Sequence, residues 1–146
     1  MENAAGAQVA VNAGDGHITL LVQRSKAKID FDKYDGRLRC RVKLHTEGSI
    51  EGARFMEDYL YDAQIMKQLQ NDFANRIREE IDEILYVFQQ ELGVDGFGLK
   101  ELLRKKDWQL YEEYMHQAQD DWRAVFEDID FAVDVDVLIR NSGAVK

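Results

Sequence analysis

The side chains of this chain that could do chemistry are few and lie far apart in the sequence. Three histidines, His17, His45 and His116, fall in different predicted elements, and Cys40 is the one cysteine among 146 residues. A zinc site needs Cys and His ligands at short, regular spacings, and no such pattern is present. We therefore predict no metal site, and a lone cysteine excludes an internal disulfide.

Cys40 has two interpretations. It stands between Arg39 and Arg41, whose positive charges could lower the pKa of a thiol and make it reactive. It also lies in an alternating strand pattern, where a small side chain of this type is normally buried. No histidine or acid stands beside it in the sequence to support reactivity, so burial is the favoured interpretation.

Carboxylates recur along one side of the last strand pattern, at Asp130, Asp134 and Asp136. Such a row could hold calcium or supply an acid–base pair, but it lacks the turn glycine of a calcium loop. The alternation with apolar residues indicates instead the solvent-exposed side of a sheet. No nucleophile or acid–base group is assembled elsewhere, so we predict no catalytic residue, no cofactor and no enzyme.

A glycine-rich segment, Asp95-Gly96-Phe97-Gly98, separates a long helical pattern from shorter ones. A phosphate-binding loop would add a Lys and a Ser or Thr and would follow a strand, so that function is disfavoured. Glycine permits backbone angles that strain other residues, and an Asp side chain can accept hydrogen bonds from nearby amides. We predict a structural pivot that reverses the chain, with Phe97 packed in the core between the long helix and the helix of Trp122.

Two tryptophans, Trp108 and Trp122, follow this pivot and could stack on a ligand. Their helical spacing beside other apolar residues favours a core position for both. Apolar residues at helical spacing also predict a long amphipathic helix from about 53 to 92, which could break near Asp62 and should stop at Gly93. A short helix over 99–106 and a third helix, capped by Asp107 and running to about 126, complete the set.

Strands are predicted on both sides of the helices. A hairpin spans 17–45 and turns at Asp35-Gly36, with a change of phase near Arg24-Ser25 that indicates a bulge. A regular alternation over 129–140 predicts the last strand. Residues 1–16 are predicted to be a flexible arm or a short first strand.

Together these elements predict a single α+β domain over 17–146. Its antiparallel sheet of three to four strands carries one long and two shorter helices on one face, in the order β-β-(β)-α-α-α-β. The outer face of the 37–45 strand is basic and that of the last strand is acidic, and opposite charges stabilise neighbouring strands. We therefore predict that the last strand lies beside a hairpin strand. The same charged residues are the candidates for contact with a partner: Arg37, Arg39, Arg41, Lys43, Asp130, Asp134 and Asp136.

Composition limits the class of protein. Apolar content of 45 % favours a folded chain, and the net charge of −9 argues against nucleic-acid binding. No stretch approaches the roughly 20 apolar residues of a membrane helix, and the N-terminus has no signal-peptide pattern. Taken alone, this chain is expected to be soluble.

A series of short motifs follows in order from Gln89 onward: Gln89-Gln90 at a helix end, Val94-Asp95-Gly96-Phe97-Gly98, Trp108, Trp122-Arg123-Ala124-Val125-Phe126 as Trp-x-x-x-Phe, and Ile139-Arg140-Asn141-Ser142-Gly143 as Ile-Arg-x-x-Gly. In these motifs and their order, the chain resembles the C-terminal domain of the Ger(x)C family, the GerAC/GerBC-type C subunits of spore germinant receptors. Two departures from the family are visible: the glycine segment is shorter than the Asp-x-x-Gly-Phe-Gly type, and no proline precedes Trp108.

The resemblance implies a non-catalytic α+β domain that works in nutrient-triggered germination through protein–protein contacts. Family members resemble lipoproteins held by an acylated N-terminal cysteine at the outer face of the spore inner membrane, where they act with integral membrane subunits of A and B type. Cys40 lies in mid-strand and cannot be that cysteine, so the resemblance assigns the lipid anchor to a longer parent protein. The alternative is a domain that itself senses a nutrient germinant.

Overall fold

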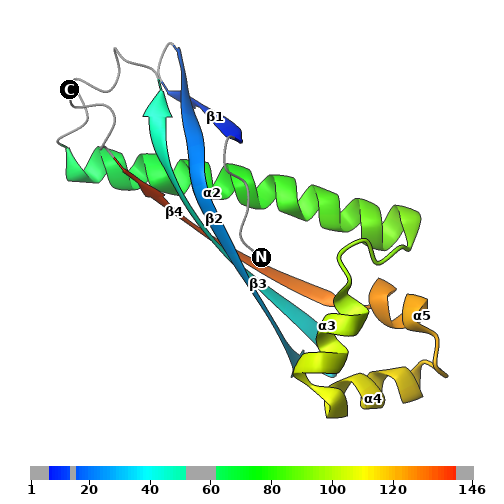
Figure 1. Ribbon diagram of the computed structural model, residues 1–146. Helices are drawn as coiled ribbons and strands as arrows, with labels where there is room; N and C mark the ends of the chain where they lie inside the picture. The colour runs from blue at the N-terminus through cyan, green and yellow to red at the C-terminus, as the bar shows by residue number, and fades with distance from the viewer. Residues whose placement is uncertain (1–6, 14–15, 52–61, 141–146) are drawn as a thin grey trace. The chain divides into compact units, whose positions relative to one another are not determined.

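The computed structural model describes residues 7–13, 16–51 and 62–140. Four strands form one sheet in the order β1-β2-β3-β4 (Figure 1). These are β1 (Gln8–Ala13), β2 (Gly16–Tyr34), β3 (Arg37–Glu51) and β4 (Asp130–Ile139). The helical elements are α2 (Ala63–Tyr86), its π-helical continuation η1 (Val87–Leu92), α3 (Leu99–Lys106), α4 (Trp108–Gln117) and α5 (Trp122–Glu127). The α+β class is confirmed, and β1 provides the short first strand.

The hairpin of β2 and β3 follows the sequence pattern closely. Asp35 and Gly36 both have positive φ, at 53° and 76°, as a two-residue turn between antiparallel strands requires. In β2, two successive exposed residues, 23 and 24, separate buried Val22 from buried Ser25. The predicted change of phase is therefore present, and it keeps apolar side chains on one face along a strand of 19 residues.

The last strand, β4, lies beside β3, so the prediction that it neighbours a hairpin strand is confirmed. Its direction differs from the prediction. His45 contacts Asp136, and Gly48 O accepts a hydrogen bond from Arg140 N at 2.8 Å, so partner numbers rise together along both strands. The arrows of β3 and β4 in Figure 1 accordingly point the same way. An antiparallel sheet throughout was wrong at this pair, because the helices between the two strands provide the long crossover that parallel neighbours need.

Helix ends are set by side-chain caps and left-handed residues. Asp62 Oδ1 accepts hydrogen bonds from the amides of Gln64 and Ile65, at 3.0 and 3.2 Å, and so caps α2; the part of the long helix predicted over 53–61 lies outside the described residues. Gly93, with φ of 61°, ends η1 where the sequence placed the stop.

The predicted third helix is in fact two helices. α4 ends at Gln117, and Gln119 and Asp120 then adopt positive φ, at 54° and 64°, which an α-helix cannot continue through. Asp121 starts α5 by accepting a hydrogen bond from Arg123 N at 3.1 Å. The prediction of one helix was wrong here because apolar spacing continues across a turn that only the backbone angles show.

The contacts of the chain divide it into two compact units. The first unit comprises residues 1–28, 43–80 and 134–146, and the second unit comprises residues 29–42 and 81–133. The boundaries fall inside β2, β3, β4 and α2, so each unit contains part of each of these elements.

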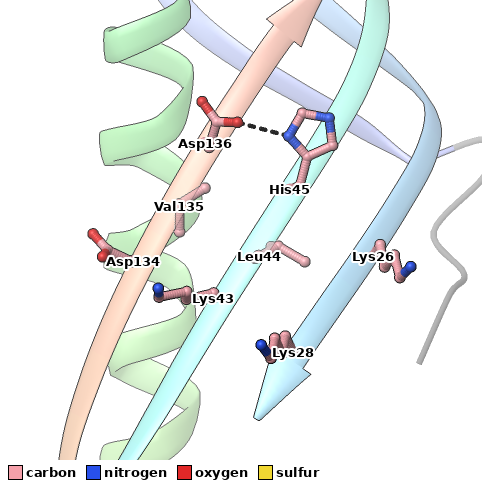
Figure 2. A pocket seen from close by; sticks show the side chains of 8 residues that line it. All are labelled: Lys26, Lys28, Lys43, Leu44, His45, Asp134, Val135 and Asp136. Atoms are coloured by element: carbon pink, nitrogen blue, oxygen red, sulfur yellow. Dashed lines mark hydrogen bonds and ion pairs between the residues drawn. The ribbon is translucent and has the colours of Figure 1, made fainter. Parts of the chain in front are cut away.

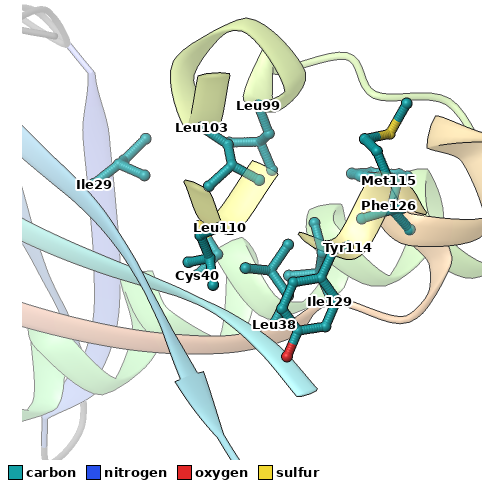
Figure 3. Packing of buried hydrophobic residues seen from close by; sticks show 11 residues of the cluster. Ile29, Leu38, Cys40, Leu99, Leu103, Leu110, Tyr114, Met115, Phe126 and Ile129 are labelled. Carbon is teal, nitrogen blue, oxygen red and sulfur yellow. The ribbon is translucent and has the colours of Figure 1, made fainter. Parts of the chain in front are cut away.

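Each unit has its own buried residues. In the first unit, Leu69 and Phe73 of α2 are buried, as are Val137 and Ile139 of β4, and Ile139 N donates to Gln70 Oε1 at 2.9 Å. The core of the second unit combines strand and helix residues (Figure 3): Ile29, Leu38, Cys40, Leu99, Leu103, Leu110, Tyr114, Met115, Val125, Phe126 and Ile129.

A buried amide connects η1 to this second core. The side chain of Gln89 donates hydrogen bonds to Phe126 O at 3.0 Å and to Ile129 O at 2.6 Å. Buried carbonyls need such partners, since an unpaired one is costly. Gln89 therefore ties the end of the long helix to the junction between α5 and β4.

Candidate functional site

The outer face of the sheet in the first unit is hollowed into a groove of about 550 Å³. This volume lies within the range of small-molecule pockets. Figure 2 shows the side chains of three neighbouring strands along the groove, which we call the charged groove: Lys26 and Lys28 of β2, Lys43, Leu44 and His45 of β3, and Asp134, Val135 and Asp136 of β4.

Charge is sorted across the charged groove by strand. On the opposite, buried side of the hairpin, Ser25 Oγ lies 3.1 Å from Thr46 Oγ1, a pairing that places Lys28 opposite Lys43. The β2 side is therefore basic, and β4 supplies the carboxylates. The outer-face charges that the sequence indicated are thus brought together here from residues more than a hundred positions apart.

Some polar side chains of this face are paired with one another within the chain. His45 Nδ1 lies 2.6 Å from Asp136 Oδ2, and its Nε2 lies 3.3 Å from Glu47 Oε2. Glu47 also accepts a hydrogen bond from Arg140. That bond lowers the pKa of Glu47 below its ordinary value, against the opposing effect of burial. Asp136 and His45 are therefore already committed to partners.

Three charges of the charged groove are not committed. Among the described residues, Lys26, Lys43 and Asp134 make no hydrogen bond or ion pair within the chain, and all three are exposed. Charged side chains on two or more strands that lack internal partners are available to a ligand or to another protein.

The basic residues predicted for partner contact in the second unit are paired internally. Arg39 donates two hydrogen bonds of 2.8 Å to the two oxygens of Asp32, and its guanidinium lies 4.4 Å from the centre of the Tyr34 ring. Arg41 Nε lies 3.4 Å from Asp32 Oδ2. The Arg39 hydrogen bond lowers the pKa of Asp32, and the same contact raises that of Arg39.

Arg37 and Asp130 complete this part of the predicted row. Arg37 Nη2 donates to Asp128 O at 2.9 Å and lies 3.7 Å from the Asp128 carboxylate. Asp130 is half-buried, and its charge adds to that of Asp32 in raising the pKa of Arg39. The predicted contact row is thus divided: Lys43, Asp134 and Asp136 lie in the charged groove, and the others lie in the second unit.

The pivot is organised by Asp95. Its Oδ1 accepts hydrogen bonds from the amides of Phe97 at 3.3 Å and Leu99 at 3.0 Å, and its Oδ2 accepts from Lys100 N at 3.0 Å. Oδ2 also accepts from Trp122 Nε1 at 3.1 Å. One carboxylate therefore caps α3 and anchors the first residue of α5. The sequence indicated the bonds to local amides, but the bond to Trp122 carries no sequence signal.

Phe97 does not occupy the core position predicted for it. Its side chain is 38 % exposed, and its ring meets Phe88 edge-on with 4.9 Å between ring centres. A Cβ at Gly96 would lie 2.7 Å from the Phe88 ring, and Gly98 has φ of 71°. The glycines thus serve a close approach and a left-handed turn that hold Phe97 against Phe88 at the surface.

The two tryptophans have different environments. Trp122 packs against the core of the second unit, as predicted. Trp108 is 52 % exposed, so the prediction of a core position was wrong. Its ring lies 5.5 Å from that of Tyr111, which lies 6.5 Å from Trp122, and the Arg104 guanidinium lies 5.7 Å from the Trp108 ring. These contacts along α3 and α4 replace burial in holding Trp108.

An exposed apolar segment was not foreseen. Nine large hydrophobic side chains are exposed among the described residues, and six of them fall within residues 84–97 of the second unit. Most lie off the predicted apolar stripe of the long helix, and this was the one signal that could have found them. The exposed apolar segment consists of Ile84, Tyr86, Val87, Leu92, Val94 and Phe97.

Burial decides between the two interpretations of Cys40. Cys40 is fully buried in the core of the second unit, and burial raises the pKa of its thiol to about 12. A protonated, inaccessible thiol is a packing residue, so the favoured interpretation is confirmed.

Within the described ranges, no cluster of three or more His, Cys, Asp or Glu is placed to hold a metal ion. None of the helices described is both long and apolar enough to cross a membrane.

Comparisons with known proteins give one family and one fold. The model of the family described as "Spore germination B3/ GerAC like, C-terminal" matches residues 1–143. Among solved structures, the crystal structure of the GerBC protein matches with a TM-score of 0.79 at 18 % identity. The match covers 93 % of this chain and 41 % of that chain, so this chain spans about two fifths of the length of GerBC. The search of curated proteins finds no match.

Proposed function

The chain belongs to the spore germination B3/GerAC-like C-terminal family, and from this membership we propose that it is a non-catalytic contact domain of a germinant-receptor C subunit. Its role in nutrient-triggered germination is to hold partner proteins rather than to transform a substrate. The partners are the integral membrane subunits of A and B type, and the lipid anchor of the parent protein places the domain at the outer face of the spore inner membrane.

One observation carries this contact function: the exposed apolar segment of residues 84–97. Exposed hydrophobic side chains are ordinary when scattered, but a concentration of them is typical of interaction surfaces. The aromatic members Tyr86 and Phe97 are of the type enriched in the energetically important centre of an interface. Hydrogen bonds of Gln89 and Asp95 order the backbone of this segment, so its exposed side chains are preorganised for a partner.

The test is retention of the membrane subunits by the C subunit in the assembled receptor. Leu92→Ser combined with Val94→Ser removes two exposed side chains of the segment, and Leu138→Ser, on the exposed side of β4, is the matched control. We expect the double variant to release the A and B subunits on purification, while the control retains them. Both should melt like the wild type, because none of the three side chains is buried. Full retention by the double variant would contradict the assignment.

The predicted contact row of charged side chains is a second part of the same proposal. Charge reversals at Arg39 and Arg41 and at Asp134 and Asp136, each read by the same purification, ask whether these side chains also contact a partner. Because Arg39 and Arg41 are paired with Asp32, their reversal must be accompanied by a measurement of unfolding. Loss of retention without loss of stability would support a contact through the charged face.

A second candidate is nutrient sensing by the domain itself, and the charged groove is the observation that favours it. Its volume of about 550 Å³ and its uncommitted charges suit a small polar molecule. NMR titration with amino acids and sugars distinguishes the two functions. Saturable shifts confined to the groove residues would support sensing.

A further inference from the structure

We propose that the charged groove binds a short free peptide of two or three residues. The peptide lies across β4, β3 and β2, with its ammonium group at Asp134 and its carboxylate at Lys26 and Lys43. This assignment is independent of the contact function of the exposed apolar segment, which belongs to the second unit.

The arrangement of charge is the first reason. Lys26 on β2 and Lys43 on β3 project from the same face of the sheet. Neither side chain has a partner among the described residues, whereas Lys28 does interact within the chain. Two unpartnered ammonium groups on neighbouring strands in a chain of net charge −9 favour a bound anion.

The opposite side of the groove favours a cation. Asp134 on β4 has no partner among the described residues, whereas Asp136 is held by His45. A ligand that carried only negative charge would leave Asp134 unsatisfied and would be repelled by it. A ligand with opposite charges at its two ends satisfies both sides.

Length selects the size of this ligand. Neighbouring strands lie about 4.8 Å apart, so β4 and β2, which flank β3, are separated by about 9.6 Å. Extended peptides span about 3.5 Å per residue, so two or three residues reach from Asp134 to the lysines. The two charges of a single amino acid are separated by one carbon atom, so it is shorter than the separation between Asp134 on β4 and Lys26 on β2.

The interior of the groove suits a peptide backbone. Leu44 and Val135 also line the groove, and because they alternate with the charged residues of β3 and β4, their backbone is what the groove presents to a ligand. The contact of Asp136 with His45 and Glu47 leaves no free carboxylate at that position to compete for the ammonium group. Asp134 is therefore the one uncommitted carboxylate among the residues that line the groove.

The experiment is a titration of this chain with trialanine, followed by NMR and calorimetry. The comparison ligands are alanine, N-acetyl-trialanine, trialanine amide and inorganic phosphate. We expect saturable shifts at the groove residues with trialanine, and affinity at least about tenfold weaker for each ligand that lacks one charge or is too short.

Three variants assign the two ends. Asp134→Asn should weaken trialanine about tenfold but leave N-acetyl-trialanine unchanged, because that ligand has no ammonium group to lose. Lys26→Gln combined with Lys43→Gln should weaken trialanine and spare trialanine amide. Lys100→Gln, on α3 in the second unit, is the matched control and should change nothing.

Several outcomes would overturn the assignment. Equal affinity for trialanine, N-acetyl-trialanine and trialanine amide would show that the end charges are not recognised. Binding of phosphate as tight as that of trialanine would indicate an anion site without the Asp134 contact. Absence of any saturable shift would remove the site, and it would leave the retention of membrane subunits by the exposed apolar segment untouched.

Discussion

Charged side chains on the outer sheet face behave differently in the two units. In the second unit, Arg37 binds Asp128, and Arg39 and Arg41 bind Asp32. In the first unit, the sequence has the same alternation of charged and apolar residues, but Lys26, Lys43 and Asp134 have no partners in the described chain. An alternating charged pattern therefore marks a solvent-facing side of a sheet, but it does not distinguish charges that stabilise the fold from charges that are available to a ligand.

The same contrast appears among the carboxylates. Asp95 accepts four hydrogen bonds within the second unit, whereas Asp134 accepts none from the described residues of the first. Substitutions that remove one charge from each class should therefore separate structural residues from binding residues.

The largest effect is expected for Asp95→Ala. It leaves the amides of Leu99 and Lys100 and the indole of Trp122 without their acceptor, so unfolding free energy should fall by about 2 kcal/mol. Urea denaturation measures the change. Asp95→Asn, which keeps one acceptor oxygen, should recover part of it. Wild-type stability for the alanine variant would mean that the pivot is not held by this carboxylate.

A smaller loss is expected for Phe97→Ala. The ring is partly exposed and contributes mainly its edge-on contact with Phe88, which is worth about 1 kcal/mol. The same denaturation series provides the measurement, and the loss should be well below that of a buried aromatic residue such as Phe126. If receptor assembly fails while stability is almost unchanged, Phe97 acts chiefly as a contact residue.

The ion pair of Asp32 with Arg39 should make the stability of the protein depend on pH in the acid range. The Arg39 hydrogen bond depresses the pKa of Asp32 below its ordinary value of 3.8. As the pH falls, the Asp32 carboxylate therefore binds a proton first in the unfolded chain. The stability that the ion pair contributes is present above pH 3.8 and is lost as the pH falls through the lower pKa of Asp32 in the folded protein. Asp32→Asn should destabilise the protein at pH 7 and have little effect at the lowest pH at which it remains folded.

Denaturation at several pH values provides this measurement, with Asp134→Asn as the control for removal of one negative charge. At pH 7 the control should unfold at the same denaturant concentration as the wild type, because Asp134 has no partner among the described residues. An Asp32→Asn effect that is the same at every pH would mean that its cause is not the ion pair with Arg39.

The smallest effects are expected in the charged groove. Lys43→Gln and Asp134→Asn should each change unfolding free energy by less than about 0.5 kcal/mol, because neither side chain has a partner in the described chain. Thermal melts would detect a larger change. Such a loss would place these residues with the paired charges of the second unit and would weaken the case for a ligand.

Much of the fold follows from local patterns. Alternation in β2 and β4, the positive-φ turn at Asp35-Gly36 and the stop at Gly93 all lie where the sequence indicated them. A place for β4 beside a hairpin strand was predicted from charge, and the structure shows that this strand is β3. These features depend on the spacing of apolar residues, on the backbone angles that glycine permits and on pairing between neighbouring strands. Short stretches of sequence are enough to determine each of them.

The candidate site is less visible in the sequence. Asp134 and Lys43 were both candidates, and Lys26 and Lys28 were recognised as basic, but only the strand order brings these residues around one groove. The exposed apolar segment was missed because the apolar stripe of the long helix was the only pattern considered, and most of these residues lie off it. Trp108 was misplaced because apolar spacing in a helix predicts a buried side chain, whereas its burial depends on which neighbours cover it.

By itself, the sequence determined the class of fold, the family features and the identity of the pivot, since each depends on residue type and short spacing. The tertiary structure decided the parallel direction of β4, the hydrogen bond from Trp122 to Asp95 and the separation of paired from unpaired charges. These depend on contacts between residues distant in the chain, where geometry rather than composition decides which partner each side chain finds. Phe97 illustrates the difference, because its glycine neighbours predicted the turn but not that the ring would remain at the surface.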